Sequence, residues 1–327
     1  MAILIIGGAG YIGSHIARAL QEKGREAVVF DSLERGHRQA VGDAAFVQGD
    51  LRSPADLQKA FQDHEIEAVI HCAGYALVDE SMRAPERYYE NNVSGTLSLL
   101  GAMHAAGVSR IVFTSSGAVY GEPERIPIEE EHQQVPASVY GHATQCAEKM
   151  LEWFDVVYGI KSVTLRCFNA AGAHPSGDIG ELLPSGSRLI PAAIQAALGE
   201  RDGVPLYGER YHTRDGSCVR DYVHVCDLAE AHALALDWLA AGKPSRVFNI
   251  GRGNGLSVRE ILEEVEKISG KKIPVRVEPN RPGDPAIVIA NTGAARAELG
   301  WQPKYKDIGA IIKTAFAWQT GTAKRWS

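Results

Sequence analysis

Short apolar runs alternate with amphipathic segments along the first half of the chain. The runs occupy residues 2–6, 27–30, 45–47, 68–71, 110–113 and 162–166. Apolar residues at helical spacing fill most of the intervals, at 12–20, 53–63, 85–106 and 138–157. Continuous apolar runs are typical of strands buried on both faces, so the alternation predicts an α/β fold with a doubly wound parallel sheet.

The second half is less regular. Gly and Pro cluster from Ala171 to Ser187, which predicts a long loop. The later segments comprise helical patterns at 189–198, 225–239 and 257–269, a strand-like run at 247–251, and two short helical patterns at the end. The late strand indicates that the chain returns to the first domain after it has entered a second one.

A glycine-rich turn follows the first strand. Gly7-Gly8-Ala9-Gly10-Tyr11-Ile12-Gly13 joins the apolar run at 2–6 to the first helical pattern. Glycines in such a turn let the backbone approach a pyrophosphate, and free N–H groups at the helix start face its oxygens. We interpret the motif as a Rossmann-type dinucleotide site, and the alternative is a plain strand-to-helix turn.

Asp31 ends the second strand, 18 residues after Gly13. An acidic side chain there accepts hydrogen bonds from a ribose diol and repels a 2′-phosphate, which favours NAD over NADP; a turn or cap residue is the alternative. We therefore expect residues 1–170, with a return near 221–252, to form an NAD-binding domain. Residues 171–220 and 253–327 would form a smaller α/β domain that binds the substrate.

Ligands of doubly wound sheets bind beyond the carboxyl ends of the strands. Asp50 follows the third strand, where it could meet an adenine edge or cap a helix. Asn92 lies inside the helical pattern at 85–106, where it either faces water or ties neighbouring strand-end loops together.

Hydroxyl groups gather after the strand at 110–113, in Thr114-Ser115-Ser116. Tyr140 follows Ser116 by 24 residues and begins the helical pattern at 138–157. Hydroxyls at a strand end can hydrogen-bond a substrate hydroxyl or carbonyl. A tyrosine acts as an acid or base when a neighbouring cation lowers its pKa.

Charge and cysteine content narrow the function classes. The net charge is −6, from 34 basic and 40 acidic residues without a run of like charge, which argues against nucleic acid or an anionic membrane as partner. No apolar stretch reaches the roughly 18 residues of a membrane span, and Met1 leads directly into a strand, without the basic region of a signal peptide. The five cysteines are scattered without C-x-x-C spacing, which predicts reduced thiols in a cytoplasm and no metal site.

Six motifs together resemble the UDP-glucose (UDP-galactose) 4-epimerase family of extended short-chain dehydrogenases/reductases. They are the turn at 7–13, Asn91-Asn92-Val93, the segments 115–121, 168–175 and 218–225, and Arg281-Pro282-Gly283-Asp284-Pro285. The resemblance covers nearly the whole chain. It implies a homodimer that binds NAD and a UDP-sugar.

The resemblance also implies roles for individual residues. Tyr140 takes the proton of the sugar 4-hydroxyl while a hydride moves from C4 to NAD, and Ser116 hydrogen-bonds the same oxygen. The implied cofactor residues are Gly7, Gly10, Tyr11, Ile12, Gly13, Asp31, Asp50, Leu51, Ala73, Asn92, Ser115, Tyr140 and Phe168. The implied substrate residues are Ser116, Asn169 and Leu189, Tyr207 against uracil, Arg220 and Arg281 on the diphosphate, and Asp284 and Val288. Val288 stands where a bulky aromatic restricts the pocket to plain hexoses, so N-acetylated sugars are expected to fit.

The chain departs from the family pattern at three positions. Cys167 replaces a tyrosine, Ile6 replaces a threonine before the glycines, and Thr144 replaces the lysine of Y-x-x-x-K, which makes it the third predicted catalytic position. An ammonium about 6 Å from the phenol would stabilise the phenolate by roughly 2.8 kcal/mol at an effective dielectric near 20. The absence of a lysine at position 144 predicts either weakened catalysis or an engineered site. The sequence does not distinguish between these two explanations.

Two other functions compete with the 4-epimerase. A nucleotide-sugar 4,6-dehydratase needs an Asp-Glu pair after the strand-end threonine, where this chain has Ser115-Ser116, which argues against it. A protein that binds NAD and a nucleotide-sugar with little or no turnover stays open because of Thr144.

Overall fold

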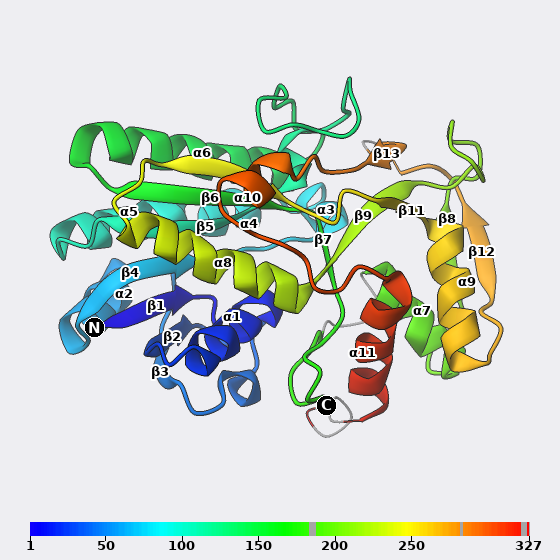
Figure 1. Ribbon diagram of the computed structural model, residues 1–327, viewed down its shortest axis with the longest axis horizontal. Coiled ribbons are helices and arrows are strands. Elements are labelled where there is room, and N and C mark those ends of the chain that lie inside the picture. The colour runs from blue at the N-terminus through cyan, green and yellow to red at the C-terminus, as the bar shows by residue number, and fades with distance from the viewer. Residues whose placement is uncertain (183–187, 282–283, 322–325, 327) are drawn as a thin grey trace.

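The main body is a seven-stranded parallel sheet, seen in a computed structural model that describes residues 1–182, 188–281, 284–321 and 326 (Figure 1). The strand order β10-β6-β5-β4-β1-β2-β3 is that of a doubly wound sheet, as predicted. The strands are β1 (Ala2–Ile6), β2 (Ala27–Asp31), β3 (Ala45–Gln48), β4 (Ile66–His71), β5 (Arg110–Ser116), β6 (Lys161–Cys167) and β10 (Arg246–Ile250).

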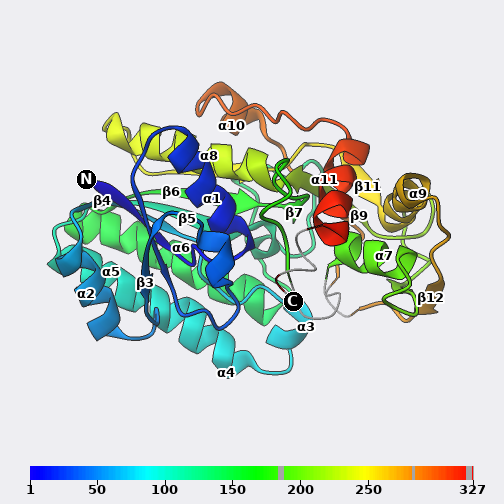
Figure 2. The ribbon, with the colours of Figure 1, turned by 90° about the horizontal axis from the view of Figure 1, so that it is seen from below.

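Helices cover both faces of this sheet (Figure 2). One layer contains α1 (Tyr11–Glu22) and α8 (Val225–Ala240), and the other contains α2 (Pro54–Asp63), α5 (Gly95–Ala105) and α6 (Val139–Tyr158). Ile3 and Ile5 of β1 pack in the first core, whereas Leu4 and Ile6 pack in the second. Each such buried side chain contributes about 1.5–3 kcal/mol, which is why the strand is apolar without interruption.

The predicted helix at 85–106 is one helical run with a π-helical interruption. It consists of α4 (Pro85–Tyr88), a π-helix (Tyr89–Ser94) and α5. Asn92, in the π-helix, accepts a hydrogen bond from Tyr75 N at 2.9 Å and donates to Tyr75 O at 2.9 Å. Asn92 therefore faces inward and ties the helical run to the loop after β4, whereas its role as a link between neighbouring strand-end loops stays a prediction.

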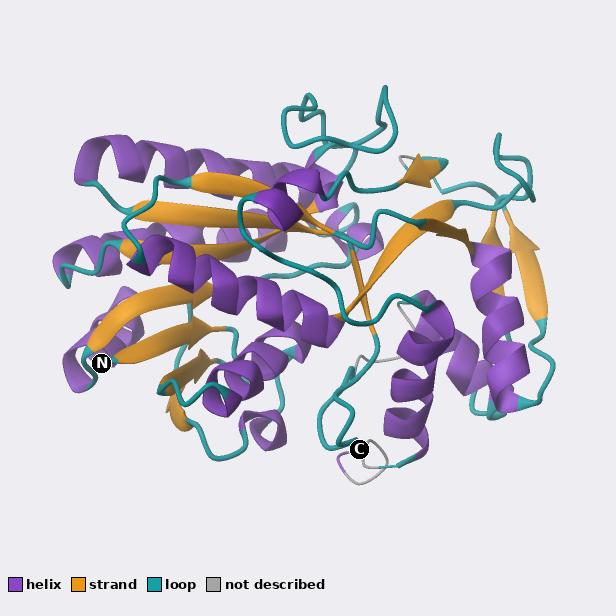
Figure 3. Cartoon of the chain, viewed as in Figure 1, coloured by secondary structure: helices purple, strands orange, loops and turns teal. Residues whose placement is uncertain are grey.

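A second group of elements lies beyond the carboxyl ends of the large sheet (Figure 3). The helices α7 (Leu189–Ala197), α9 (Val258–Ser269) and α11 (Ile308–Thr320) share one hydrophobic core. The strands here are β7 (Asn169–Ala171), β9 (Val219–His224), β11 (Gly255–Ser257) and β13 (Ile287–Val288), with β8 (Val204–Tyr207) and β12 (Val275–Glu278) as a separate pair. The sequence pattern missed most of these strands because they are short and only partly buried.

The remaining elements are short. They are α3 (Val78–Ser81), α10 (Gly293–Ala297) and the 3₁₀ turns Arg38–Val41 and Gly117–Val119. The long loop predicted at 171–187 is irregular from Gly172 to Leu182, and 183–187 lie outside the described residues. None of the described helices combines the length and apolar character needed to cross a membrane.

A buried ion pair ties β6 to α6. Arg166 Nη2 lies 2.8 Å from Glu148 Oε2, and the two side chains are 5% and 3% exposed. Glu148 also accepts a hydrogen bond from the Ser115 hydroxyl, and Arg166 donates to the Tyr120 hydroxyl at 2.8 Å. Because Ser115 belongs to β5, the pair fixes three neighbouring elements relative to one another at the edge where the predicted catalytic residues lie.

Candidate active site

A cavity of about 720 Å³ lies at the carboxyl ends of β4, β5 and β6 and reaches the second group of elements. Many of the predicted site residues line it. These are Ile12, Ala73, Asn92, Ser115, Ser116, Tyr140, Thr144, Phe168, Asn169, Leu189, Tyr207, Arg220, Arg281, Asp284 and Val288. The other predicted cofactor residues are outside the described lining, at the ends of β1, β2 and β3: Gly7, Gly10, Tyr11, Gly13, Asp31, Asp50 and Leu51.

The glycine-rich turn is packed too closely to accept side chains. Gly7 has a φ of +82°, and a Cβ there would lie 2.5 Å from Ala73 N. A Cβ on Gly13 would lie 2.2 Å from Gly7 O. Within the described chain, no side chain caps the N-terminus of α1 and its first turn holds no acidic residue. The turn therefore fits the pyrophosphate of a dinucleotide, because no side chain competes for the first N–H groups of α1.

Asp31 holds the glycine turn from the next strand. Its carboxylate accepts hydrogen bonds from Ala9 N at 3.0 Å and from Leu33 N at 2.8 Å. Burial raises the pKa of Asp31, and these two hydrogen bonds oppose the rise. Asp31 thus acts as a turn residue in the structure. Its contact with a ribose stays a prediction.

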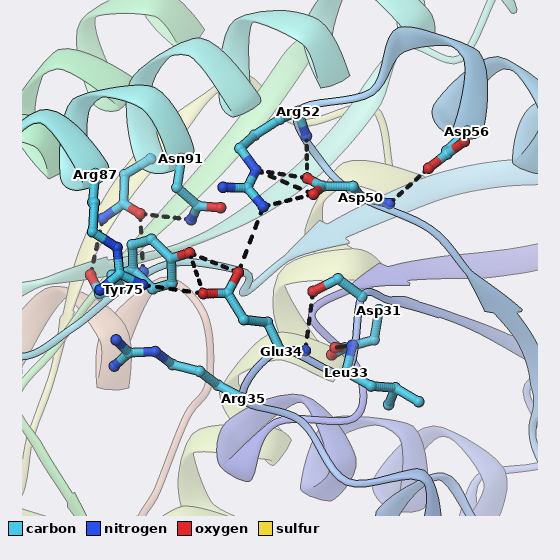
Figure 4. Close-up of polar contacts among 12 residues, drawn as sticks. Asp31, Leu33, Glu34, Arg35, Asp50, Arg52, Asp56, Tyr75, Arg87 and Asn91 are labelled. Carbon is cyan, nitrogen blue, oxygen red and sulfur yellow. Dashed lines mark hydrogen bonds and ion pairs between the residues drawn. The ribbon is translucent and has the colours of Figure 1, made fainter.

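Charged side chains surround the loops after β2, β3 and β4 (Figure 4). Arg52 Nε donates to Asp50 at 2.9 Å, and this contact lowers the pKa of the Asp50 carboxyl. The alternative role of Asp50 as a helix cap is wrong, since Ser53 caps α2. Tyr75 donates its hydroxyl to Glu34 at 2.7 Å, which links the β2 and β4 loops. Sequence reasoning missed Glu34, because nothing in its local pattern marks a partner 41 residues away.

Tyr140 lies in the first turn of α6, which begins after the cap residue Ser138. Burial raises the pKa of Tyr140, while a hydrogen bond with Ser116 and the positive charge of Arg188 lower it. The Thr144 hydroxyl donates to the backbone oxygen of Tyr140 at 2.9 Å. Ser116 and Tyr140 are therefore brought together as predicted, and Thr144 adds no charge beside the phenol.

Both predicted diphosphate arginines are paired with carboxylates. Arg220 contacts Asp284, and Arg281 Nη2 lies 3.2 Å from Asp79. The Arg281 guanidinium also lies over the Tyr207 ring, 3.6 Å from its centroid. These contacts hold planar donors at one end of the cavity, in the geometry that suits phosphate oxygens.

Sequence reasoning missed two charged residues of the cavity, Glu181 and Arg188. Arg188 Nε lies 3.2 Å from Glu181 Oε1, and the Glu181 side chain is buried. Glu181 lies within the segment 171–187 predicted as a loop, and Arg188 directly follows it. The only available signal was the position of Arg188 directly before the helical pattern at 189–198.

Comparison with known proteins shows the family to which the chain belongs. The model of the NAD dependent epimerase/dehydratase family matches residues 3–251. The chain is 47% identical to the UDP-glucose 4-epimerase of Lacticaseibacillus casei over 97% of this chain and 96% of that protein. It therefore belongs to the NAD-dependent epimerase/dehydratase family, among the UDP-glucose 4-epimerases.

Solved structures of such enzymes superpose closely on this fold. The UDP-glucose 4-epimerase from Brucella ovis in complex with NAD has a TM-score of 0.94 at 42% identity, covering 97% of this chain and 98% of that one. The enzyme from Bifidobacterium longum in complex with NAD⁺ and UDP has a TM-score of 0.94 at 36% identity, covering 99% of both chains.

The geometry of the turn predicts that Gly13→Ala weakens NAD binding. The added Cβ meets backbone atoms, and overpacking of about 1–3 kcal/mol, if it is expressed in binding, corresponds to a loss of affinity of about fivefold to about 150-fold. The measurement is the NAD released from purified, denatured protein, together with its dissociation constant. Gly101→Ala on α5 is the matched control, since a Cβ there meets nothing within 4 Å. Recovery of mainly NADP from the unmodified protein would contradict the role of Asp31.

Proposed function

We propose that this protein interconverts UDP-glucose and UDP-galactose by reversible oxidation at the sugar C4. The observation that carries the proposal is the meeting of Ser116 and Tyr140 in the cavity that Arg220 and Arg281 also line. An acid–base pair at the end of β5 and two arginines farther out match a sugar carried by a diphosphate. The relatives with this activity span nearly the full length of the chain.

Different residues of the chain would carry out different parts of the reaction. NAD, when bound, supplies a hydride acceptor and donor. The Tyr140 phenolate takes the proton of the 4-hydroxyl as the C4 hydride leaves, and Ser116 hydrogen-bonds the oxygen of the resulting 4-keto sugar. Arg220 and Arg281 hold the diphosphate while the sugar turns, and Tyr140 returns the proton after hydride reaches the other face of C4. The sugar thus inverts at C4 with no net oxidation.

Other residues would bind the cofactor and the nucleotide. The glycine turn and the α1 N-terminus would hold the pyrophosphate of NAD, and Asp31 would face its adenosine ribose. Asp50 and Leu51, which follow β3, would contact the adenine. Asn169, Leu189 and Tyr207 line the substrate part of the cavity. We propose residues 1–170, with the return near 221–252, as the NAD-binding domain and 171–220 with 253–327 as the substrate-binding domain.

The proposed activity is tested by incubating the purified protein with UDP-galactose and measuring UDP-glucose. Thr144→Lys should raise the rate, because a lysine four residues after Tyr140 lies on the same helix face and favours the phenolate. The roughly 2.8 kcal/mol of charge stabilisation sets an upper limit of about a hundredfold. Because the lysine lowers the pKa of the Tyr140 phenol, the activity of the Thr144→Lys variant should begin to rise at a lower pH.

Tyr140→Phe is the control for this experiment and should abolish conversion in both backgrounds. If Thr144→Lys changes neither the rate nor the pH profile of a folded protein that holds NAD, then Thr144 does not limit catalysis. If UDP-galactose binds but neither form converts it, the protein is a binder of NAD and nucleotide-sugar without turnover.

Val288 should admit N-acetylated sugars. It lines the cavity and pairs with Arg220 in the β13–β9 register, which places it beside a proposed diphosphate ligand. We expect UDP-N-acetylglucosamine to bind within about tenfold of UDP-glucose, because the small side chain leaves room for the acetyl group. Val288→Tyr should exclude the acetylated sugar and keep UDP-glucose. Isothermal titration checks both, and equal binding of the two sugars by the tyrosine variant would contradict the role of this position.

We propose that the protein is a cytoplasmic homodimer joined through α5 and α6. Trp153, Val156 and Val157 near the end of α6 are 66%, 76% and 62% exposed, and Leu97 on the neighbouring α5 is 51% exposed. Such an apolar patch on two adjacent helices fits a second copy of the same surface. All five cysteines are free thiols, which supports a reducing compartment.

The proposed dimer predicts that a charged side chain in this apolar patch dissociates the two subunits. Val156→Glu should convert the dimer to a monomer, because the carboxylate would be buried against apolar side chains. Light scattering after size exclusion gives the mass directly. Val277→Glu is the control, an equivalent change at an exposed valine of β12, and should leave the mass unchanged. A monomeric unmodified protein would contradict the proposal.

A further inference from the structure

An ion pair joins two parts of the fold where the cavity meets solvent. Asp79 lies on α3, in the connection that follows β4 of the large sheet, and Arg281 follows β12 of the second group of elements. Both residues line the cavity, and Arg281 Nη2 lies 3.2 Å from Asp79 Oδ2. The two side chains are 35% and 50% exposed, so a ligand that enters from solvent meets this pair.

We propose that Asp79 is a latch on Arg281: it holds the guanidinium in the substrate-free protein and competes for it with the diphosphate of a UDP-sugar. The inference rests on the proposed function, which assigns Arg281 to that diphosphate, and adds a residue that sets the affinity for the substrate. Because the ion pair is given up when the diphosphate binds, Asp79 lowers the affinity of the site for UDP-sugars.

The helix that carries Asp79 is fixed from the cofactor side of the cavity. Glu80, the next residue, accepts hydrogen bonds from Arg35 Nη2 on both carboxylate oxygens, at 2.6 and 2.7 Å. The Tyr88 hydroxyl donates to the backbone oxygen of Leu77, directly before α3, at 2.7 Å. Since α3 is anchored in this way, the movement that breaks the latch belongs to the long arginine side chain opposite it.

A second contact keeps Arg281 within reach of a ligand. Its guanidinium lies over the Tyr207 ring, 3.6 Å from the ring centroid. A ring face stabilises a cation without using the N–H donors, which lie in the plane of the guanidinium. These donors are therefore available for an anion, and two phosphate oxygens match their planar arrangement.

The neighbouring pair of Arg220 and Asp284 has a different character. Arg220 is only 14% exposed, and both partners belong to the second group of elements. Asp79 instead reaches its arginine from the opposite side of the cavity and is half exposed. An exposed ion pair is weak, and a diphosphate carries more negative charge than one carboxylate, so the diphosphate wins the competition.

The test is the binding of UDP to the purified, NAD-loaded protein, measured by isothermal titration. Asp79→Asn should tighten UDP binding by about twofold to about fivefold, the fold-change that corresponds to an exposed ion pair. Asp79→Glu should bind UDP like the unmodified protein, because it retains the charge. Uridine lacks phosphate and should bind all three proteins equally. The gain should also shrink in about 0.5 M salt, which screens exposed charges.

A double-mutant cycle shows whether Asp79 acts through Arg281. Arg281→Gln should weaken UDP binding, and adding Asp79→Asn to it should give no gain, because the latch has then lost its partner. Glu86→Gln is the matched control. It removes another exposed carboxylate, on α4, which lies outside the described lining of the cavity, and should leave UDP binding unchanged.

The proposal is wrong if Asp79→Asn leaves UDP binding unchanged or weakens it, since Asp79 would then not compete with the diphosphate. It is equally wrong if the gain extends to uridine or persists in the Arg281→Gln background. The titration needs no turnover. A protein that shows the expected UDP binding but converts no UDP-galactose would therefore refute the proposed function and leave the latch in place.

Discussion

The close approach of backbone to backbone at the glycine turn is the constraint on which the site depends. Gly7 lies against Ala73 and Gly13 lies against Gly7, at distances that leave no room for a Cβ. These contacts bring the end of β1, the end of β4 and the start of α1 to one point. That point is the topological switch of the sheet, where β1 and β4 are neighbours and the chain continues in opposite directions. The cavity begins beside this point, at the end of β4, and continues along the ends of β5 and β6.

Two kinds of ion pair support the surrounding geometry, one buried between β6 and α6 and the other in the wall of the cavity. The buried pair of Arg166 and Glu148 is rigid, because breaking it would leave a charge without a partner in the protein interior. The ion pairs of Arg220 and Arg281 are more exposed. An anion that enters the cavity can therefore replace the carboxylates as the partner of these guanidinium groups. The first kind of pair holds β6 and α6 together, and the second keeps two guanidinium groups in the wall of the cavity.

Much of the fold could be predicted because the large sheet is buried on both faces. Its apolar runs, the helical patterns at 53–63 and 138–157 and the glycine turn are local signals, and the structure confirms them as strands, helices and a strand-to-helix turn. The small strands β8, β11, β12 and β13 could not be predicted, since their pairing depends on distant segments rather than on their own pattern. The π-helix at Tyr89–Ser94 was missed for the same reason, because it accompanies a hydrogen bond between Asn92 and the distant residue Tyr75. In the site, residues within motifs were foreseen, whereas Glu34, Glu181 and Arg188 act through partners that only the tertiary fold brings near.

The position of β10 has a consequence for the order of synthesis. This strand pairs with β6, yet the whole of β7 through α8 separates the two along the chain. While the ribosome makes that intervening segment, β6 has an unpaired edge that invites association with other nascent chains. Asn249 of β10 also receives the Tyr120 hydroxyl and donates to Ile128 O, so the loop after Ser116 acquires its support only when β10 arrives. The edge of the large sheet that carries Ser116 is therefore among the last parts of the sheet to be completed during synthesis.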